Sequence, residues 1–217
     1  MCRTVKTREY EIIHYTGLGR SKSFLKYSIL IVLLILLRSA CFGHLDATLP
    51  KYMLRIFNDN AHFGIMLAVH SITMLVSLFL FTSLTYKVSD YSLIVVGAFV
   101  GTVSSSVLIF STSLFSFVVF VVGISIGESL WVPRLLDYTF SVATKEHEGI
   151  YLALSNCPFY FAMILTGASS GKLFEVYCSG DNSSYCGNIW TFIFFSSVFI
   201  PFLLLVFRSK IEERYNN

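Results

Sequence analysis

Long runs of apolar residues, separated by short polar segments, dominate the pattern along this chain. A helix that crosses a bilayer needs about 20 mostly apolar residues. We predict six such helices, at roughly residues 27–45, 64–84, 91–110, 114–136, 150–173 and 189–207. The alternation over about ten residues that marks a membrane β-strand is absent from runs such as 30–37. The pattern therefore predicts an all-α membrane protein with six transmembrane helices.

The connections between these runs are short and rich in Asn, Asp, Ser and Lys. None is long enough to fold as a separate domain. We therefore expect one six-helix transmembrane domain over residues 27–207, embedded in the lipid bilayer. A basic N-terminal segment, 1–26, precedes it, and a short tail, 208–217, follows it.

The positions of Lys and Arg predict the orientation, because cytoplasmic loops carry an excess of both. With the N-terminus inside, the cytoplasmic side collects Arg3, Lys6, Arg8, Arg20, Lys22, Lys26, Lys87, Lys145, Arg208, Lys210 and Arg214. The other side has only Lys51, Arg55 and Lys172. Both termini are therefore predicted to be cytoplasmic, in either the plasma membrane or an internal membrane.

Composition excludes several classes of protein. The chain is 55% hydrophobic and 13% charged, with a mean hydropathy of +0.70, against roughly 25% charged residues in soluble domains. Soluble enzymes and disordered chains are therefore excluded. The net charge of +3 resides near the chain ends rather than in a basic stripe with aromatic residues, so we expect no nucleic-acid partner. No enzyme motif or metal-ligand spacing is present, so we expect neither catalysis nor a cofactor.

The fifth connection, 175–188, is predicted to face the lumen or exterior. It contains Cys178, Cys186 and the sequon Asn182-Ser183-Ser184. Asn182 is therefore a candidate glycosylation site. In an oxidising compartment the two cysteines could close a small loop, and two free thiols are the alternative.

Pairs of glycines at helical spacing recur in three of the predicted helices. They are Gly97 with Gly101, Gly123 with Gly127, and Gly167 with Gly171. Such pairs let two helix backbones approach closely within a membrane. We therefore expect close helix contacts at all three, with ordinary packing as the alternative to a moving contact.

Ionisable residues inside the spans are the candidate functional residues, because each costs about 2.5 to 3.5 kcal/mol on insertion scales. The candidates for a solute or proton pathway are Glu128, Arg38, His44, Asp46 and His70. Glu128 lies deep in the fourth span, where it either takes up and releases a proton or is permanently paired with a cation such as Arg38.

The other polar candidates have competing interpretations. His44 and Asp46 form either a proton relay or simply the outer end of the first helix, and His70 is either a polar filler or part of a pathway. Arg134 and Asp137 are three residues apart at the inner end of the fourth helix. That spacing favours a fixed ion pair at the cytoplasmic mouth.

One part of the sequence resembles a known family. Residues 127–134, Gly-Glu-Ser-Leu-Trp-Val-Pro-Arg, are followed by Tyr138, Lys145 and a fifth span rich in small residues. This pattern, which includes Gly149, resembles the tenth and eleventh helices of major facilitator superfamily transporters, especially protist members and the related proton-coupled oligopeptide branch. Residues 43–52 likewise resemble the end of the seventh helix. One position departs from the motif, since Val132 stands where the family has Ser before the proline.

The resemblance implies that the chain is the C-terminal six-helix half of a twelve-helix major facilitator superfamily bundle. It also implies that Glu128 lies in a central cavity and contacts the amino end of a substrate. We therefore expect a transporter, or half-transporter, of a small polar or amphipathic solute by alternating access, with proton symport as one option. The second half would come from a second copy or another chain. The alternatives are a non-transporting scaffold or partner subunit and a truncated fragment of a longer transporter.

Overall fold

The computed structural model describes residues 22–57, 63–143, 147–178 and 186–212, and these ranges contain helices and turns but no strand. The first span is built from α2 (Lys22–Leu37), the π-helix η1 (Arg38–Phe42) and α3 (His44–Ala47). The remaining helices are α4 (Leu49–Phe57), α5 (Phe63–Leu84), α6 (Asp90–Ser105), α7 (Val107–Phe110), α8 (Leu114–Val142), α9 (Glu148–Ser155), α10 (Cys157–Tyr177) and α11 (Asn188–Glu212).

Six helical stretches of the described chain are long and apolar enough to cross a membrane. They are Ser23–Ala47, Phe63–Leu84, Asp90–Phe110, Leu114–Val142, Glu148–Tyr177 and Asn188–Ser209. The six predicted helices are therefore confirmed, and the chain has the features of an integral multi-pass membrane protein. Some helices extend past the apolar runs: α8 continues to Val142 and α11 to Glu212.

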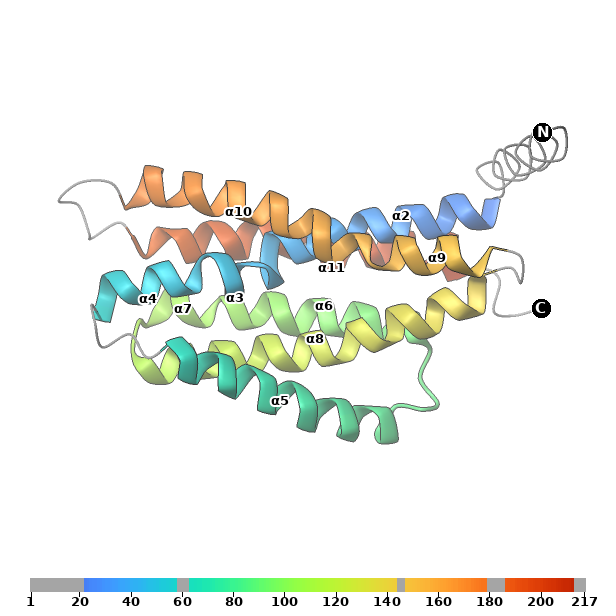
Figure 1. The fold of residues 1–217 in the computed structure, drawn as a ribbon, viewed down its shortest axis with the longest axis horizontal. Helices are drawn as coiled ribbons and strands as arrows, with labels where there is room; N and C mark the ends of the chain where they lie inside the picture. Colours follow the sequence, from blue (N-terminus) through green and yellow to red (C-terminus); the bar gives the residue numbers. More distant parts are fainter. Residues whose placement is uncertain (1–21, 58–62, 144–146, 179–185, 213–217) are drawn as a thin grey trace, which may run out of the picture.

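The helices lie side by side along the length of the molecule (Figure 1). α8 packs against α6 and α5, α6 also packs against α11, and α2 contacts both α11 and α10. This order leaves α5 and the α9–α10 span at the margins of the bundle. Only 11% and 28% of their most apolar windows are buried, against 61% for α8. The two marginal spans therefore present wide apolar surfaces.

Serine side chains begin two of the spans. Ser89 precedes α6 and accepts a hydrogen bond from the Ser92 amide at 3.4 Å. Ser113 precedes α8 and accepts one from the Ser116 amide at 3.2 Å. Each hydroxyl satisfies a backbone donor that the first helical turn leaves unpaired.

Glycines bring α6 and α8 into backbone contact. A Cβ atom added to Gly97 would lie 2.6 Å from the Gly127 carbonyl oxygen, and one added to Gly127 would lie 2.8 Å from the Gly97 carbonyl oxygen. A Cβ on Gly123 would lie 2.1 Å from Oγ of Ser104, and one on Gly101 would meet the ring of Phe42. Close contacts at the first two glycine pairs are therefore present.

The third glycine pair behaves differently. A Cβ added to Gly167 or Gly171 would meet no described atom within 4 Å. The close contact that we expected at this pair is absent from the described part of the chain. Both glycines are exposed, so no described side chain or backbone packs directly on them.

Candidate functional site

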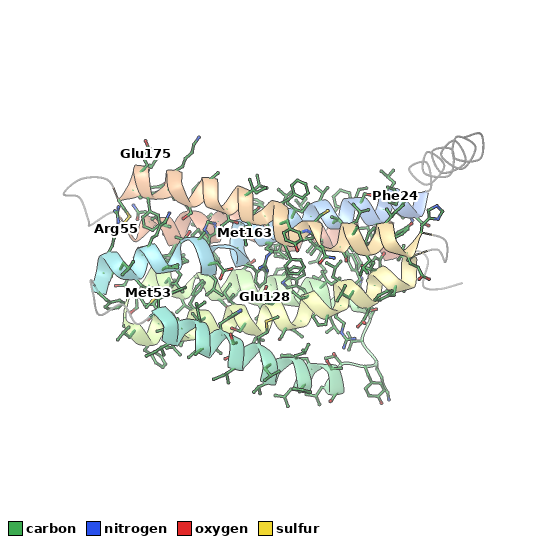
Figure 2. All side chains as sticks on the ribbon, in the orientation of Figure 1. Phe24, Met53, Arg55, Glu128, Met163 and Glu175 are labelled. Carbon is green, nitrogen blue, oxygen red and sulfur yellow. A yellow bond between two sulfur atoms is a disulfide. The ribbon has the colours of Figure 1, made fainter. Side chains whose placement is uncertain are left out.

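Arg38 and Glu128 meet at the centre of the bundle. Glu128 is the midpoint of α8, and Arg38 is the first residue of η1; Figure 2 shows Glu128 near the middle of the bundle's length. Nη1 of Arg38 donates a hydrogen bond to Oε1 of Glu128, and the two side chains are only 16% and 9% exposed. Of the two interpretations open for Glu128, the structure contains the pairing with Arg38.

The π-helix sets the position of Arg38 in the first span. The Gly43 amide donates to the Arg38 carbonyl oxygen at 2.7 Å, an i to i+5 bond. The wider turn leaves the Ser39 carbonyl oxygen to accept a hydrogen bond from Oγ1 of Thr166 on α10, at 3.3 Å. Gly43 is required here because a Cβ atom would lie 2.4 Å from the same Thr166 oxygen. Short π-helical segments inside α-helices frequently occur at functional sites.

Aromatic rings hold the Arg38 guanidinium from the side of α10. Its carbon Cζ lies 4.7 Å from the ring centroid of Phe159. The Phe159 ring stacks in turn on Trp131 of α8, with centroids 5.8 Å apart and planes at 16°. A cation above an aromatic face is stabilised electrostatically. Arg38 is therefore held by Glu128 and by Phe159 together.

His70 of α5 is the third ionisable residue of the site. Its Nε2 atom lies 3.7 Å from Oε2 of Glu128, and its Nδ1 atom lies 2.8 Å from Oγ of Ser125. Ser125 Oγ is also 2.6 Å from the Val121 carbonyl oxygen. His70 therefore contacts the second oxygen of the carboxylate that pairs with Arg38.

A cavity of about 300 Å³ opens beside this ion pair, between the first span and α10. Its lining residues are Arg38, Gly43, Asp46, Ala47, Phe159, Met163, Thr166 and Gly167; Figure 2 labels Met163, on the α10 side. This volume is at the lower end of the range for small-molecule sites. The cavity combines charged groups from the first span with apolar groups from α10.

His44 and Asp46 occupy different environments. His44 is buried, and its Nδ1 atom lies 2.6 Å from Oγ1 of Thr48, which donates to Ser170 Oγ at 3.0 Å. Asp46 is exposed and lines the cavity. No hydrogen bond or ion pair joins the two side chains in the described chain. The structure therefore places Asp46 with the cavity and His44 in a buried polar contact between helices.

Arg134 and Asp137 are brought together in the C-terminal part of α8. Nη1 of Arg134 lies 3.1 Å from Oδ2 of Asp137 and 3.5 Å from Oδ1 of Asp90. Nη2 donates to Oγ1 of Thr85 at 3.0 Å. Arg134 therefore links α8 to the turn between α5 and α6, in addition to the pairing expected from sequence.

The opposite end of the bundle carries a disulfide between Cys178 and Cys186, with Cα atoms 4.9 Å apart. It joins the end of α10 to the start of α11. Arg55 of α4 donates a hydrogen bond to the Cys178 carbonyl oxygen, and its guanidinium lies 5.2 Å from the ring centroid of Phe174. Asn182 lies outside the described residues.

Several site residues were not identified from the sequence. Ser125 is three residues before Glu128 and shares its helix face, so the i, i+3 spacing was a usable signal. Phe159, Met163 and Thr166 follow one another at helical spacing on α10, which predicts a shared face but not its neighbour. Asp90 gave no such signal, because its contact with Arg134 depends on how two separate helices pack.

The described residues contain no group of three or more His, Cys, Asp or Glu side chains arranged to hold a metal ion. The sequence matches no protein-family model, and neither the curated proteins nor the solved structures include one that is significantly similar to it.

Proposed function

We propose that this chain is a transport protein, or half of one, that moves a small polar or amphipathic solute across a membrane by alternating access, coupled to protons. One observation carries the proposal: the Arg38, Glu128 and His70 side chains meet at mid-span beside a cavity. Charged side chains in such positions usually serve a substrate or ion pathway.

Stability alone does not account for this ion pair. Bringing two charges out of water costs several kcal/mol per ion, and replacing a buried pair with apolar residues is often neutral or stabilising. A membrane protein that needed only helix packing could use apolar or small residues at these positions. The cost of keeping Arg38 and Glu128 in the membrane therefore favours a role in transport.

The hydrogen bonds of Ser125 support proton exchange at His70. The single hydroxyl proton of Ser125 can go to Nδ1 of His70 or to the Val121 carbonyl oxygen. In the first arrangement, neutral His70 turns a protonated Nε2 toward Glu128. In the second, Nδ1 donates to Ser125, and Nε2 carries a proton only when the ring is an imidazolium. Rotation of one hydroxyl therefore accommodates protonation of His70 without moving a heavy atom.

Protonation at His70 would act on the cavity through Glu128. The imidazolium competes with Arg38 for the same carboxylate, because the two cations face its two oxygens. A weaker ion pair between Arg38 and Glu128 lets the Arg38 side chain move. Because Arg38 lines the cavity, this movement changes the charge and shape of the cavity. This shared carboxylate gives a physical link between a proton and a solute.

Within transport proteins, we propose that the chain belongs to the major facilitator superfamily. The residues that carry the resemblance, 127–134, lie in the centre of α8 and include Glu128 and Trp131. In such transporters two six-helix halves surround a midplane cavity. The apolar surfaces of α5 and α10 are where a second half, from a second copy or another chain, would pack. The disulfide favours an orientation with Cys178 and Cys186 in the lumen or exterior.

Uptake into proteoliposomes tests the proposal. Protein in liposomes with an acidic exterior is supplied with radiolabelled solutes of four classes: cationic, zwitterionic, anionic and neutral. A transporter accumulates at least one class above protein-free liposomes, and Glu128→Gln abolishes the effect of the pH gradient. Glu175→Gln is the matched control, because Glu175 is an exposed carboxylate at the far end of the bundle (Figure 2). Absence of uptake in every class would favour the scaffold instead.

The size of the native polypeptide tests the requirement for a second half. An antibody against residues 208–217 reports the mass of the source protein in denatured membranes. A band of about twice 24.5 kDa identifies a twelve-helix transporter. A band near 24.5 kDa that migrates as a dimer or larger complex under native conditions identifies a separate partner. A native monomer would contradict the two-half architecture.

A further inference from the structure

The charges around the cavity do not balance. Arg38 is neutralised by its ion pair with Glu128. Asp46 also lines the cavity, and Arg38, Glu128 and His70 act on its carboxylate electrostatically. No ion pair or hydrogen bond to Asp46 occurs among the residues that the structure describes. With His70 neutral, the cavity and its surroundings therefore carry one uncompensated negative charge.

The uncharged polar groups of the cavity also favour a ligand that donates hydrogen bonds. Oγ1 of Thr166 directs its proton to a backbone carbonyl oxygen, that of Ala162 at 2.7 Å or of Ser39 at 3.3 Å. Toward the cavity this oxygen can therefore only accept a hydrogen bond. Nη1 of Arg38 donates to Glu128, which neutralises the guanidinium charge, and the guanidinium face lies over Phe159. An incoming solute consequently meets acceptors at Asp46 and Thr166.

The α10 wall supplies the apolar part of the site. Phe159 and Met163 line the cavity one helical turn apart, and Gly167 next to Thr166 leaves space that a larger side chain would fill. A soft thioether and an aromatic ring suit a hydrocarbon body or a cationic head. The cavity of about 300 Å³ limits the solute to a small molecule.

We propose that the cavity between the first span and α10 binds a small monocationic amine, with its ammonium group on Asp46 and Thr166 and its apolar body on Phe159 and Met163. The inference rests on the proposed function, because it names the class of solute for the same site. It assigns the cation to Asp46 rather than to Glu128, whose charge Arg38 already neutralises.

Charge-selective labelling of the cavity tests this assignment without knowledge of the natural solute. Met163→Cys is made in a protein in which Cys2, Cys41 and Cys157 are replaced by alanine and the disulfide is kept. Two methanethiosulfonate reagents of similar size, one carrying trimethylammonium and one sulfonate, are applied to the protein in liposomes. Each rate is divided by the reagent's rate with 2-mercaptoethanol.

We expect the cationic reagent to react at least about tenfold faster at this position, since one unbalanced charge close to the introduced thiol is worth that much. Asp46→Asn should bring the ratio close to one, and Asp46→Glu should restore it. Both variants should fold, because the Asp46 side chain makes no hydrogen bond or ion pair among the described residues. Glu175→Gln removes an exposed carboxylate outside the cavity and should leave the ratio unchanged.

Three outcomes would overturn the assignment: equal rates for the two reagents, faster reaction of the sulfonate, or no reaction of either reagent. A second measurement uses 2-phenylethylamine and 2-phenylethanol to protect the introduced cysteine from a neutral methanethiosulfonate. Protection by the amine alone supports the proposal, and equal protection or none contradicts it.

These labelling results are independent of transport. A cationic preference without uptake of any solute would reject the transporter and keep the amine site. Uptake of a solute without a cationic preference in labelling would reject the amine site and keep the transporter.

Discussion

Arg38 and Glu128 form an ion pair although 90 positions separate them along the chain. Arg38 begins the π-helix of the first span, and Glu128 is the midpoint of α8. The pair therefore joins the first and fourth spans at the depth where an unpaired charge is most costly.

Removing one member of this pair should destabilise the protein more than removing both. Glu128→Gln or Arg38→Met leaves a buried charge without its partner, which typically costs about 3 to 5 kcal/mol. The double variant leaves no such charge, so it should recover most of that loss in the free energy of unfolding. Titration with sodium dodecyl sulfate in mixed micelles measures all three variants. Losses that simply add would show that the two residues act independently.

Replacement of Ser125 should impair proton coupling, whereas replacement of Ser129 should not. Both serines are buried on α8 and donate to a backbone carbonyl oxygen, but only Ser125 contacts His70. Ser125→Ala should reduce acid-driven uptake by about tenfold, equivalent to one hydrogen bond of about 1.4 kcal/mol. His70→Asn should remove the dependence on the pH gradient. Equal effects of the two serine replacements would argue against the relay.

Gly97 and Gly167, each from a glycine pair at helical spacing, should respond oppositely to alanine. Gly97→Ala places a Cβ atom 2.6 Å from the Gly127 carbonyl oxygen, so α6 and α8 must separate at a cost of about 1 to 3 kcal/mol. Gly167→Ala meets open space and gains up to about 1 kcal/mol from helix propensity. Thermal unfolding in detergent compares them. Destabilisation by Gly167→Ala would indicate a partner helix on that face.

Loss of the disulfide should lower the free energy of unfolding by about 2 to 3 kcal/mol in the chain-entropy estimate for a separation of eight residues. The double variant Cys178→Ala/Cys186→Ala tests this, with Cys157→Ala as the free-thiol control. In protein denatured with sodium dodecyl sulfate, which exposes the buried Cys41, two of the five cysteines should resist alkylation until a reductant is added. Alkylation of all five without reductant would contradict the bond.

The spans were predictable because their signal is local. A run of about 20 apolar residues specifies a membrane helix without reference to the rest of the chain. The glycine spacing was similarly informative for Gly97 and Gly127, because the close approach of α6 and α8 requires a residue without a side chain on each helix. It was uninformative for Gly167, because the sequence does not say whether a neighbour exists.

The site was only partly predictable, because it depends on rotations that hydropathy does not fix. The sequence identified Arg38, Glu128 and His70 as candidates, and pairing with Arg38 was one option for Glu128. The π-helix at Arg38 changes the register of the first span by a fraction of a turn. No residue between 38 and 42 predicts a π-helix from the sequence alone. Phe159 and Asp90 entered the site only through helix packing.

The sparse burial of α5 has a consequence for how the protein is made. α5 packs chiefly against α8, which the ribosome synthesises later. During synthesis α5 must therefore remain in the bilayer on its own hydrophobicity, and the mean hydropathy of 2.1 in its most apolar window is sufficient for that. His70 enters the membrane with it, before Glu128 exists. Arg38 of the first span enters earlier still, so both partners of the Glu128 carboxylate are in the membrane before Glu128 is made.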